Sequence, residues 1–140
     1  MKSIQIAIVQ HKPVHANLKA CTTNAINYIN EAAQHGAQLI VFGETWLSGY
    51  PAWLDHCPDV ATWNNEATKD AFALMHSNSV DVNGAELKQL CDAANENKVI
   101  ICIGINEKLT EGPGSGTIYN SFVTISEEGV MVNHHRKLMP

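Results

Sequence analysis

Apolar and polar positions in the first 42 residues follow the periods of a strand, a helix and a second strand. Residues 4–9 alternate and then merge into an apolar run, which indicates a largely buried strand. Apolar side chains then recur at helical spacing over residues 18–33, with Asn17 placed to cap the helix and Gly36 placed to end it. Residues 38–42 form a second apolar strand. Together they predict a βαβ unit with parallel strands and a right-handed crossover.

The periodic pattern weakens over residues 43–83, where prolines, tryptophans and histidines interrupt it. We expect an elaborated loop there, with one short helix over residues 68–76. A connection this long is uncommon unless it is functional, as the wall or lid of a site is. A helix with an apolar face then begins at Asn83 or Gly84, and residues 99–105 form another apolar strand.

The last part of the chain changes from parallel-strand signals to hairpin signals. Residues 111–116 and 127–129 are rich in turn-forming residues, and they bound strands predicted over residues 117–125 and 130–136. This pattern adds an antiparallel meander to the parallel strands. The expected fold class is therefore α/β, with a mixed sheet and flanking helices in a single domain.

Composition narrows the classes of function. The 140 residues are 45% hydrophobic and 16% charged, which is typical of a globular domain with a well-buried core. A net charge of -5 with nine Lys plus Arg argues against nucleic acid or an anionic membrane as partner. No apolar run reaches membrane-spanning length, and no signal-peptide core follows Met1. We expect a cytoplasmic protein whose partners are small molecules or protein.

The four cysteines are scattered and form no Cys-x-x-Cys pair, so we expect reduced thiols rather than a zinc ribbon or a disulfide framework. Cys21 and Cys91 lie on apolar helix faces and Cys102 lies in a strand, which is typical of core packing. Cys57 lies in a loop beside His56, and a neighbouring histidine can lower the pKa of a thiol. Proximity in sequence does not supply the aligned geometry of a nucleophile.

The seven histidines show no ligand spacing beyond the adjacent pair His134 and His135. Adjacent strand residues point to opposite faces of a sheet, so these two cannot easily share a metal. We expect no metal and no other cofactor.

Glu44 is the first candidate for chemistry. It follows an apolar strand by a single glycine, at the carboxyl end where open α/β sheets bind ligands. We expect Trp46, Tyr50 and Trp53 to desolvate this carboxylate, which would raise its pKa and make it a better general base. The alternative is a surface glutamate at a strand end. The tryptophans, Trp63 included, either shape a substrate pocket or pack a long loop.

Lys137 is the second candidate, at the end of the last predicted strand. Period-two alternation places it on one face with His135, and places His134 with Arg136 on the other. A lysine that faces a closed site supplies a fixed positive charge for a developing anion. A solvated lysine protects an edge strand from pairing. The residues alone leave both interpretations open.

Two motifs carry a resemblance to a known family. Residues 43–51, Gly-Glu-Thr-Trp-Leu-Ser-Gly-Tyr-Pro, resemble the glutamate motif of the nitrilase superfamily of carbon-nitrogen hydrolases, and most closely its nitrilase branch. Tyr119-Asn120-Ser121 and residues 135–140 resemble the strand and lysine motif of that family, in the same order. The resemblance covers the whole chain. It implies that residues 1–140 are the N-terminal portion of a single carbon-nitrogen hydrolase domain, part of an α-β-β-α sandwich.

The resemblance also implies a Glu-Lys-Cys site that converts a nitrile to a carboxylic acid and ammonia. Glu44 is then the base, Lys137 the electrostatic partner, and Tyr50 and Trp53 the residues expected to contact substrate. In the family the nucleophilic cysteine and a second glutamate follow the lysine motif, so both lie beyond this chain. We therefore expect the isolated chain to be inactive, and to form a homo-oligomer or bind a C-terminal half that covers its apolar sheet surface.

Two alternatives remain at this point. The same three groups could serve an amidase or a cyanide-degrading enzyme of the superfamily. The chain could instead be a catalytically inactive fragment or interaction module that ends at Pro140.

Overall fold

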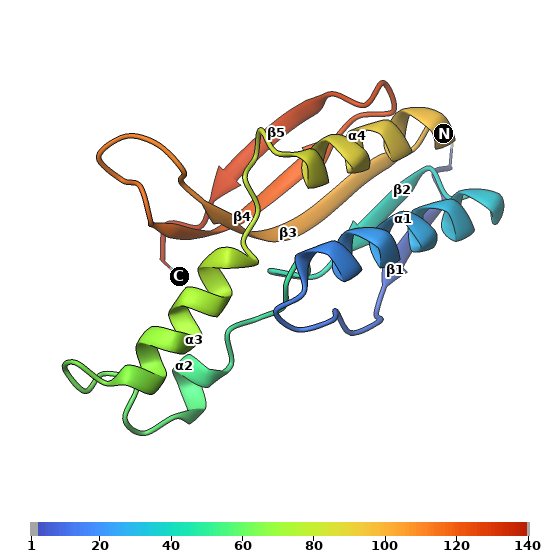
Figure 1. The fold of residues 1–140 in the computed structure, drawn as a ribbon. Coiled ribbons are helices and arrows are strands. Elements are labelled where there is room, and N and C mark those ends of the chain that lie inside the picture. The colour runs from blue at the N-terminus through green and yellow to red at the C-terminus, as the bar shows by residue number, and fades with distance from the viewer. Residues whose placement is uncertain (1–2, 140) are drawn as a thin grey trace.

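The structure is a computed structural model that describes residues 3–139. Within these residues, five strands and four helices follow one another (Figure 1). Their order is β1 (Ile6–Val9), α1 (Leu18–Gln34), β2 (Leu39–Phe42), α2 (Trp53–His56), α3 (Glu66–Ser77), α4 (Ala85–Asn97), β3 (Ile100–Lys108), β4 (Ile118–Ile125) and β5 (Met131–Arg136).

The five strands form one mixed sheet in the order β1-β2-β3-β4-β5. The strands β1, β2 and β3 are parallel, while β4 and β5 each run antiparallel to the preceding strand. The predicted βαβ unit, the antiparallel meander and the α/β class are thereby confirmed. Because β2 and β3 are parallel neighbours, the segments that follow β2 lie beside the far end of β3.

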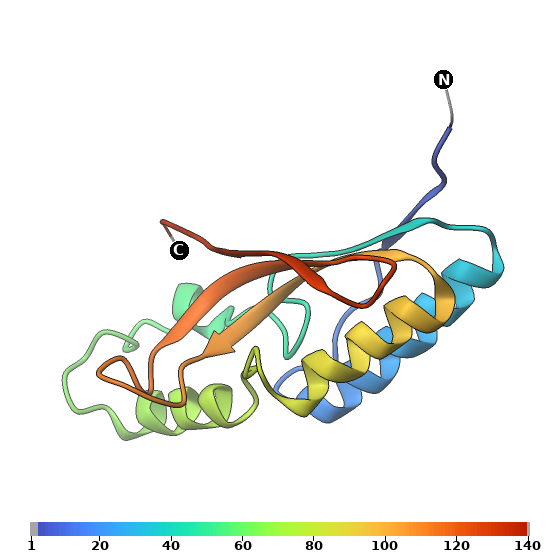
Figure 2. The ribbon, with the colours of Figure 1, turned by 90° about the horizontal axis from the view of Figure 1, so that it is seen from above.

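The helices α1 and α4 pack side by side on one face of the sheet (Figure 2). The core between them and the sheet is apolar, with Ile29 of α1, Leu90 of α4 and Ile103 of β3 fully buried. On the opposite face Ile6 and Ile8 of β1 remain 52% and 71% exposed. An apolar sheet face of this kind needs a second layer to cover it. None of the helices in the described part is long and apolar enough to cross a membrane.

The ends of α1 follow the sequence signals. Asn17 caps the helix by accepting a hydrogen bond from the Ala20 amide at 3.0 Å. Gly36 takes a φ of +87° just after the helix ends, a conformation that glycine adopts without the steric cost of a side chain. The predicted start and stop of this helix are therefore confirmed.

The segment 43–83 holds more regular structure than the sequence predicts. The short helix α2 was not expected, and α3 extends beyond the predicted 68–76 because Asn65 caps it, accepting from the Thr68 amide at 3.1 Å. Strand β3 also continues three residues past the predicted end. The first two added residues, Asn106 and Glu107, are polar, but both are buried and hydrogen-bonded.

Candidate active site

The segment after β2 carries Glu44 across the middle of β3. The Leu47 amide donates to the Gly104 carbonyl and the Gly104 amide to the Gly43 carbonyl, each at 3.2 Å. Further along the segment, the Gly49 carbonyl accepts a hydrogen bond at 2.9 Å from the buried side-chain amide of Asn106. These contacts hold the backbone on both sides of Glu44, so the position of its carboxylate is set by the sheet.

Glu44 meets two donors that come from the opposite end of the sequence. Lys137 Nζ lies 2.8 Å from Glu44 Oε1, and Asn120 Nδ2 donates to the same oxygen at 2.5 Å. The Lys137 amide in turn donates to the Asn120 carbonyl at 2.8 Å, which ties the residue after β5 to β4. The two candidates singled out in the sequence thus lie together, although 93 residues separate them.

The electrostatics of Glu44 differ from the expectation. The hydrogen bond from Lys137, and after it the one from Asn120, lowers the pKa of Glu44 below its usual value and outweighs the opposing effect of burial. The ion pair raises the pKa of Lys137 in return. The predicted rise in the pKa of Glu44 by desolvation is wrong, because half of this side chain is exposed.

The positions of the tryptophan side chains explain why the Glu44 carboxylate stays accessible to solvent. Trp46 points into the core, where its ring packs against Phe42 and its indole N–H donates to the His11 carbonyl at 2.8 Å. Trp63 is 96% exposed. Of the three tryptophans, Trp53 alone borders a cavity next to Lys137.

Two cavities, each of about 250 Å³, flank the ion pair, and Asn120 and Lys137 border both. The first lies on the sheet and includes Glu44 and His135, which shares the face of Lys137 as the alternation predicts. The second is mostly apolar and lies between the ion pair and helices α2 and α3. Its further lining residues are Thr45, Tyr50, Pro51, Trp53, Leu54, Phe72, Met75, Asn106 and Ile118.

None of the four cysteines lines either cavity. Cys57 is exposed after α2, and Cys21 is buried with its thiol donating to the Val14 carbonyl at 3.2 Å. Cys102 lies 3.7 Å from the Thr124 hydroxyl, and burial raises the pKa of Cys91. Within residues 3–139, no three His, Cys, Asp or Glu side chains are grouped as metal ligands.

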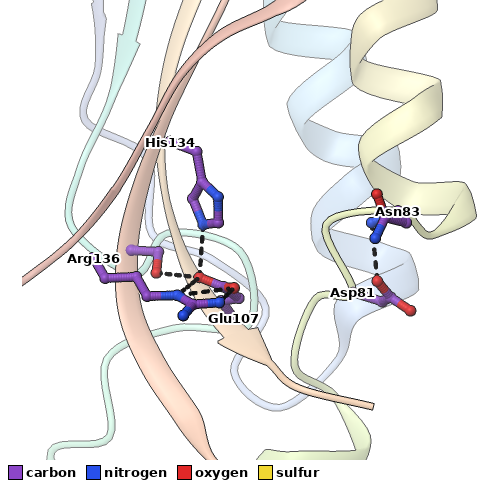
Figure 3. A network of polar contacts seen from close by, with 6 residues as sticks. Asp81, Asn83, Glu107, His134 and Arg136 are labelled. Atoms are coloured by element: carbon purple, nitrogen blue, oxygen red, sulfur yellow. Dashed lines mark hydrogen bonds and ion pairs between the residues drawn. The ribbon is translucent and has the colours of Figure 1, made fainter. Parts of the chain in front are cut away.

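Two further polar residues, Asn120 and Glu107, had no role predicted from the sequence. Asn120 lay within the Tyr119-Asn120-Ser121 motif, but no role followed from the motif alone. Glu107 is fully buried and lies beside Arg136 (Figure 3). The alternation of inward and outward positions along the strand did indicate Glu107. Positions 101, 103 and 105 face inward with apolar side chains, and residue 107 is the next inward position but carries a charge.

Comparisons with known proteins agree with this arrangement. The family model described as "Carbon-nitrogen hydrolase" matches residues 5–140. The chain is 38% identical to "Nitrilase 2" from an unknown prokaryotic organism over 138 residues, 98% of this chain and 41% of that protein. It is 33% identical to "Arylacetonitrilase" from Aspergillus oryzae over 135 residues, 96% and 37% of the two chains. It spans well under half the length of both relatives.

A solved structure shares the fold. The amidase from Nesterenkonia sp. superposes with a TM-score of 0.61 at 18% identity, over 97% of this chain and 43% of that one. The likeness of the two folds covers nearly all of the chain, as the family match does. The chain therefore belongs to the carbon-nitrogen hydrolase family.

Proposed function

We propose that this chain carries the base and the electrostatic group of a nitrile-hydrolysing site. The observation that carries the proposal is the contact of Lys137 Nζ with Glu44 Oε1 at 2.8 Å, with Asn120 on the same oxygen, at the border of two cavities. The relatives named as nitrilases, which match over nearly the whole chain, support a nitrile as substrate.

In this proposal Glu44 takes the proton of a thiol that attacks the nitrile carbon. The lowered pKa of Glu44 keeps it ionised at neutral pH, which is the form that accepts a proton. Lys137 stabilises the charge that develops on the substrate nitrogen. A bound substrate that draws Lys137 Nζ toward itself weakens the contact between Lys137 and Glu44. The pKa of Glu44 then rises, so Glu44 is a stronger base at the step in which the thiol attacks.

The remaining steps balance with two water molecules. Addition of the thiol across the carbon-nitrogen triple bond gives a covalent intermediate, and the first water replaces the nitrogen, which leaves as ammonia. The second water, activated by Glu44, cleaves the resulting thioester to the carboxylic acid and regenerates the thiol. We propose that the thiol belongs to a segment outside these 140 residues, because none of the four cysteines lines either cavity.

The apolar cavity between the ion pair and α3 is proposed to hold the substituent of the nitrile. Tyr50 and Trp53, the expected substrate contacts, both line it. Phe72 and Met75 add apolar surface from α3. Lining of this kind suits an uncharged, apolar substituent, while Lys137 and Asn120 at its border orient the reacting end.

The test is ammonia release by the complete translation product of the reading frame that contains this chain. We expect hydrolysis of aliphatic and aromatic nitriles, and a loss of activity in Glu44→Gln and in Lys137→Met. Lys88→Met is the matched control, since it breaks the surface ion pair of Lys88 with Asp92 at 2.9 Å, and it should leave the rate unchanged.

Several outcomes would change the proposal. Faster turnover of the corresponding primary amides would make an amide the substrate. Ammonia release by the 140-residue chain alone would contradict the need for an outside thiol. A complete protein that hydrolyses neither class, with its fold intact, would favour the non-catalytic interpretation of the chain.

A further inference from the structure

The buried carboxylate of Glu107 on β3 is paired with donors from β4 and β5. Arg136 Nη2 lies 2.6 Å from Oε1, and Arg136 Nε lies 3.1 Å from Oε2. The Ser121 hydroxyl donates to Oε2 at 2.6 Å, and His134 Nε2 lies 2.7 Å from the same oxygen. Figure 3 shows His134 and Arg136 pointing toward Glu107. Both oxygens are therefore occupied by groups of β4 and β5.

A second contact orients the arginine. Its Cζ lies 4.2 Å from the centroid of the Tyr119 ring, so the guanidinium is held by an aromatic face as well as by a carboxylate. The paired N–H groups of a guanidinium fit a carboxylate in one plane, which fixes the direction of the side chain and not only its distance. Such a contact restrains the backbone at Arg136, one residue before Lys137.

Residues at β4 and β5 donate hydrogen bonds to two carboxylates, Glu44 and Glu107, which lie on opposite sides of the sheet. On β4, Asn120 donates to Glu44 while its neighbour Ser121 donates to Glu107. At the end of β5, Arg136 binds Glu107 while its neighbour Lys137 binds Glu44. Because consecutive strand residues point to opposite faces, fixing one member of each pair fixes the other.

We propose that Glu107 is a positioning residue: by holding Ser121 and Arg136 on the helix-covered side of the sheet, it sets the places of Asn120 and Lys137 beside Glu44. The inward positions before it are filled by Ile101, Ile103 and Ile105, which fit the core without any charge. A buried carboxylate is costly unless it is fully paired, so a core position of this kind is better served by an apolar residue when packing is its only role.

The inference rests on the proposed role of Lys137, but its test reads the ion pair directly and needs no turnover. The experiment follows the side-chain carboxyl signal of Glu44 by NMR against pH in the complete protein that contains this chain, with isotope-labelled glutamate. The signal is assigned with Glu44→Gln. In Glu107→Gln we expect the titration midpoint of Glu44 to move upward, toward the usual value, because Lys137 and Asn120 are no longer held in place.

The sign of this shift separates positioning from direct electrostatics. Removing the negative charge of Glu107, and leaving Arg136 without its partner, would by charge alone lower the midpoint of Glu44. A rise therefore requires that the two donors have moved. A folded Glu107→Gln protein with an unchanged or lowered Glu44 midpoint would overturn the proposal.

Two further variants complete the design. Val123→Ala is the matched control, because Val123 is fully buried on β4, like Ser121, and its apolar side chain cannot donate a hydrogen bond to Glu107. It should lower stability and leave the Glu44 midpoint unchanged. If Glu107→Gln does not fold, Ser121→Ala removes one donor only, and a smaller upward shift is expected. No shift in a folded Ser121→Ala protein would count against the proposal.

Discussion

Gly104 lies directly against the backbone of Glu44, so closely that a side chain has no room between them. A Cβ atom placed on Gly104 would fall 2.7 Å from Glu44 Cα and 2.5 Å from the Gly43 carbonyl oxygen. Both are backbone atoms, which cannot turn away as the end of a flexible side chain can. The absence of a side chain at position 104 therefore lets the segment after β2 carry Glu44 over β3 toward Lys137.

Gly104→Ala should consequently move Glu44 away from its partners. We expect a loss of about 1–3 kcal/mol in the free energy of unfolding, which is the usual range for an added methyl group in a tightly packed place. The pKa of Glu44 should rise as the contact with Lys137 lengthens. Urea unfolding and an NMR titration of Glu44 measure the two effects. Gly43→Ala is the control, because a Cβ there meets no atom within 4 Å and should change neither quantity.

In the complete protein, Asn120 should affect the pH dependence of the proposed nitrile hydrolysis as well as its rate. It is the second-largest cause of the lowered pKa of Glu44, so Asn120→Ala should raise that pKa and shift the acidic limb of the pH–rate profile to higher pH. The maximal rate should fall by roughly tenfold or more. A general base contributes about 10²–10⁴-fold to the rate, and misplacing Glu44 loses part of that contribution. Asn133→Ala, on an exposed position of β5, serves as the control. An acidic limb that stays in place would show that Asn120 does not act on Glu44.

Glu107 should make the stability of the chain depend on pH in the acidic range. Burial by itself would raise the pKa of Glu107, but the hydrogen bonds from Arg136, Ser121 and His134 outweigh it and lower the pKa from 4.5 to about 2. A carboxyl group with a lowered folded-state pKa stabilises the fold fully above its unfolded pKa. This contribution, on the order of 3 kcal/mol, is lost as the pH falls from about 4.5 to about 2.

The measurement compares Glu44→Gln with the double variant Glu44→Gln, Glu107→Gln by urea unfolding between pH 2 and pH 7. The shared Glu44→Gln change removes the other carboxylate whose pKa is lowered by the same strands. We expect the difference in unfolding free energy to be largest near neutral pH and to shrink below about pH 4.5. A difference that is constant with pH would mean that Glu107 is not ionised in the folded protein.

Much of the architecture was predictable because it depends on local patterns. Asn17 and Gly36 mark the two ends of α1, as their capping preferences indicate. The apolar runs of 38–42 and 99–105 form neighbouring parallel strands. The opposite facing of Arg136 and Lys137 followed from the period of a strand. The meeting of Lys137 with Glu44 came from the resemblance of two motifs, and no local pattern in the chain indicated it.

What could not be predicted depends on three-dimensional packing. The aromatic residues near Glu44 suggested a desolvated carboxylate, yet Trp46 packs in the core and leaves Glu44 half exposed. Whether a nearby aromatic side chain covers a carboxylate depends on its direction, which sequence spacing does not give. Glu107 was missed because a charge at an inward position of a strand is stable only with partners, and these lie 14 to 29 residues further along the chain.

If the proposed nitrile hydrolysis holds for the complete protein, Phe72 should determine which nitriles are accepted, because α3 brings it to the apolar cavity beside Lys137. Phe72→Ala removes apolar contact with a bulky substituent and none with a small one. For a nitrile with an aromatic substituent kcat/KM should fall by roughly tenfold to a hundredfold, in line with about 1–3 kcal/mol for apolar groups in a pocket. Acetonitrile should be hydrolysed as before. Leu74→Ala on the same helix is the control, since Leu74 does not line this cavity, and an equal loss for both substrates in Phe72→Ala would indicate a disturbed fold rather than a lost contact.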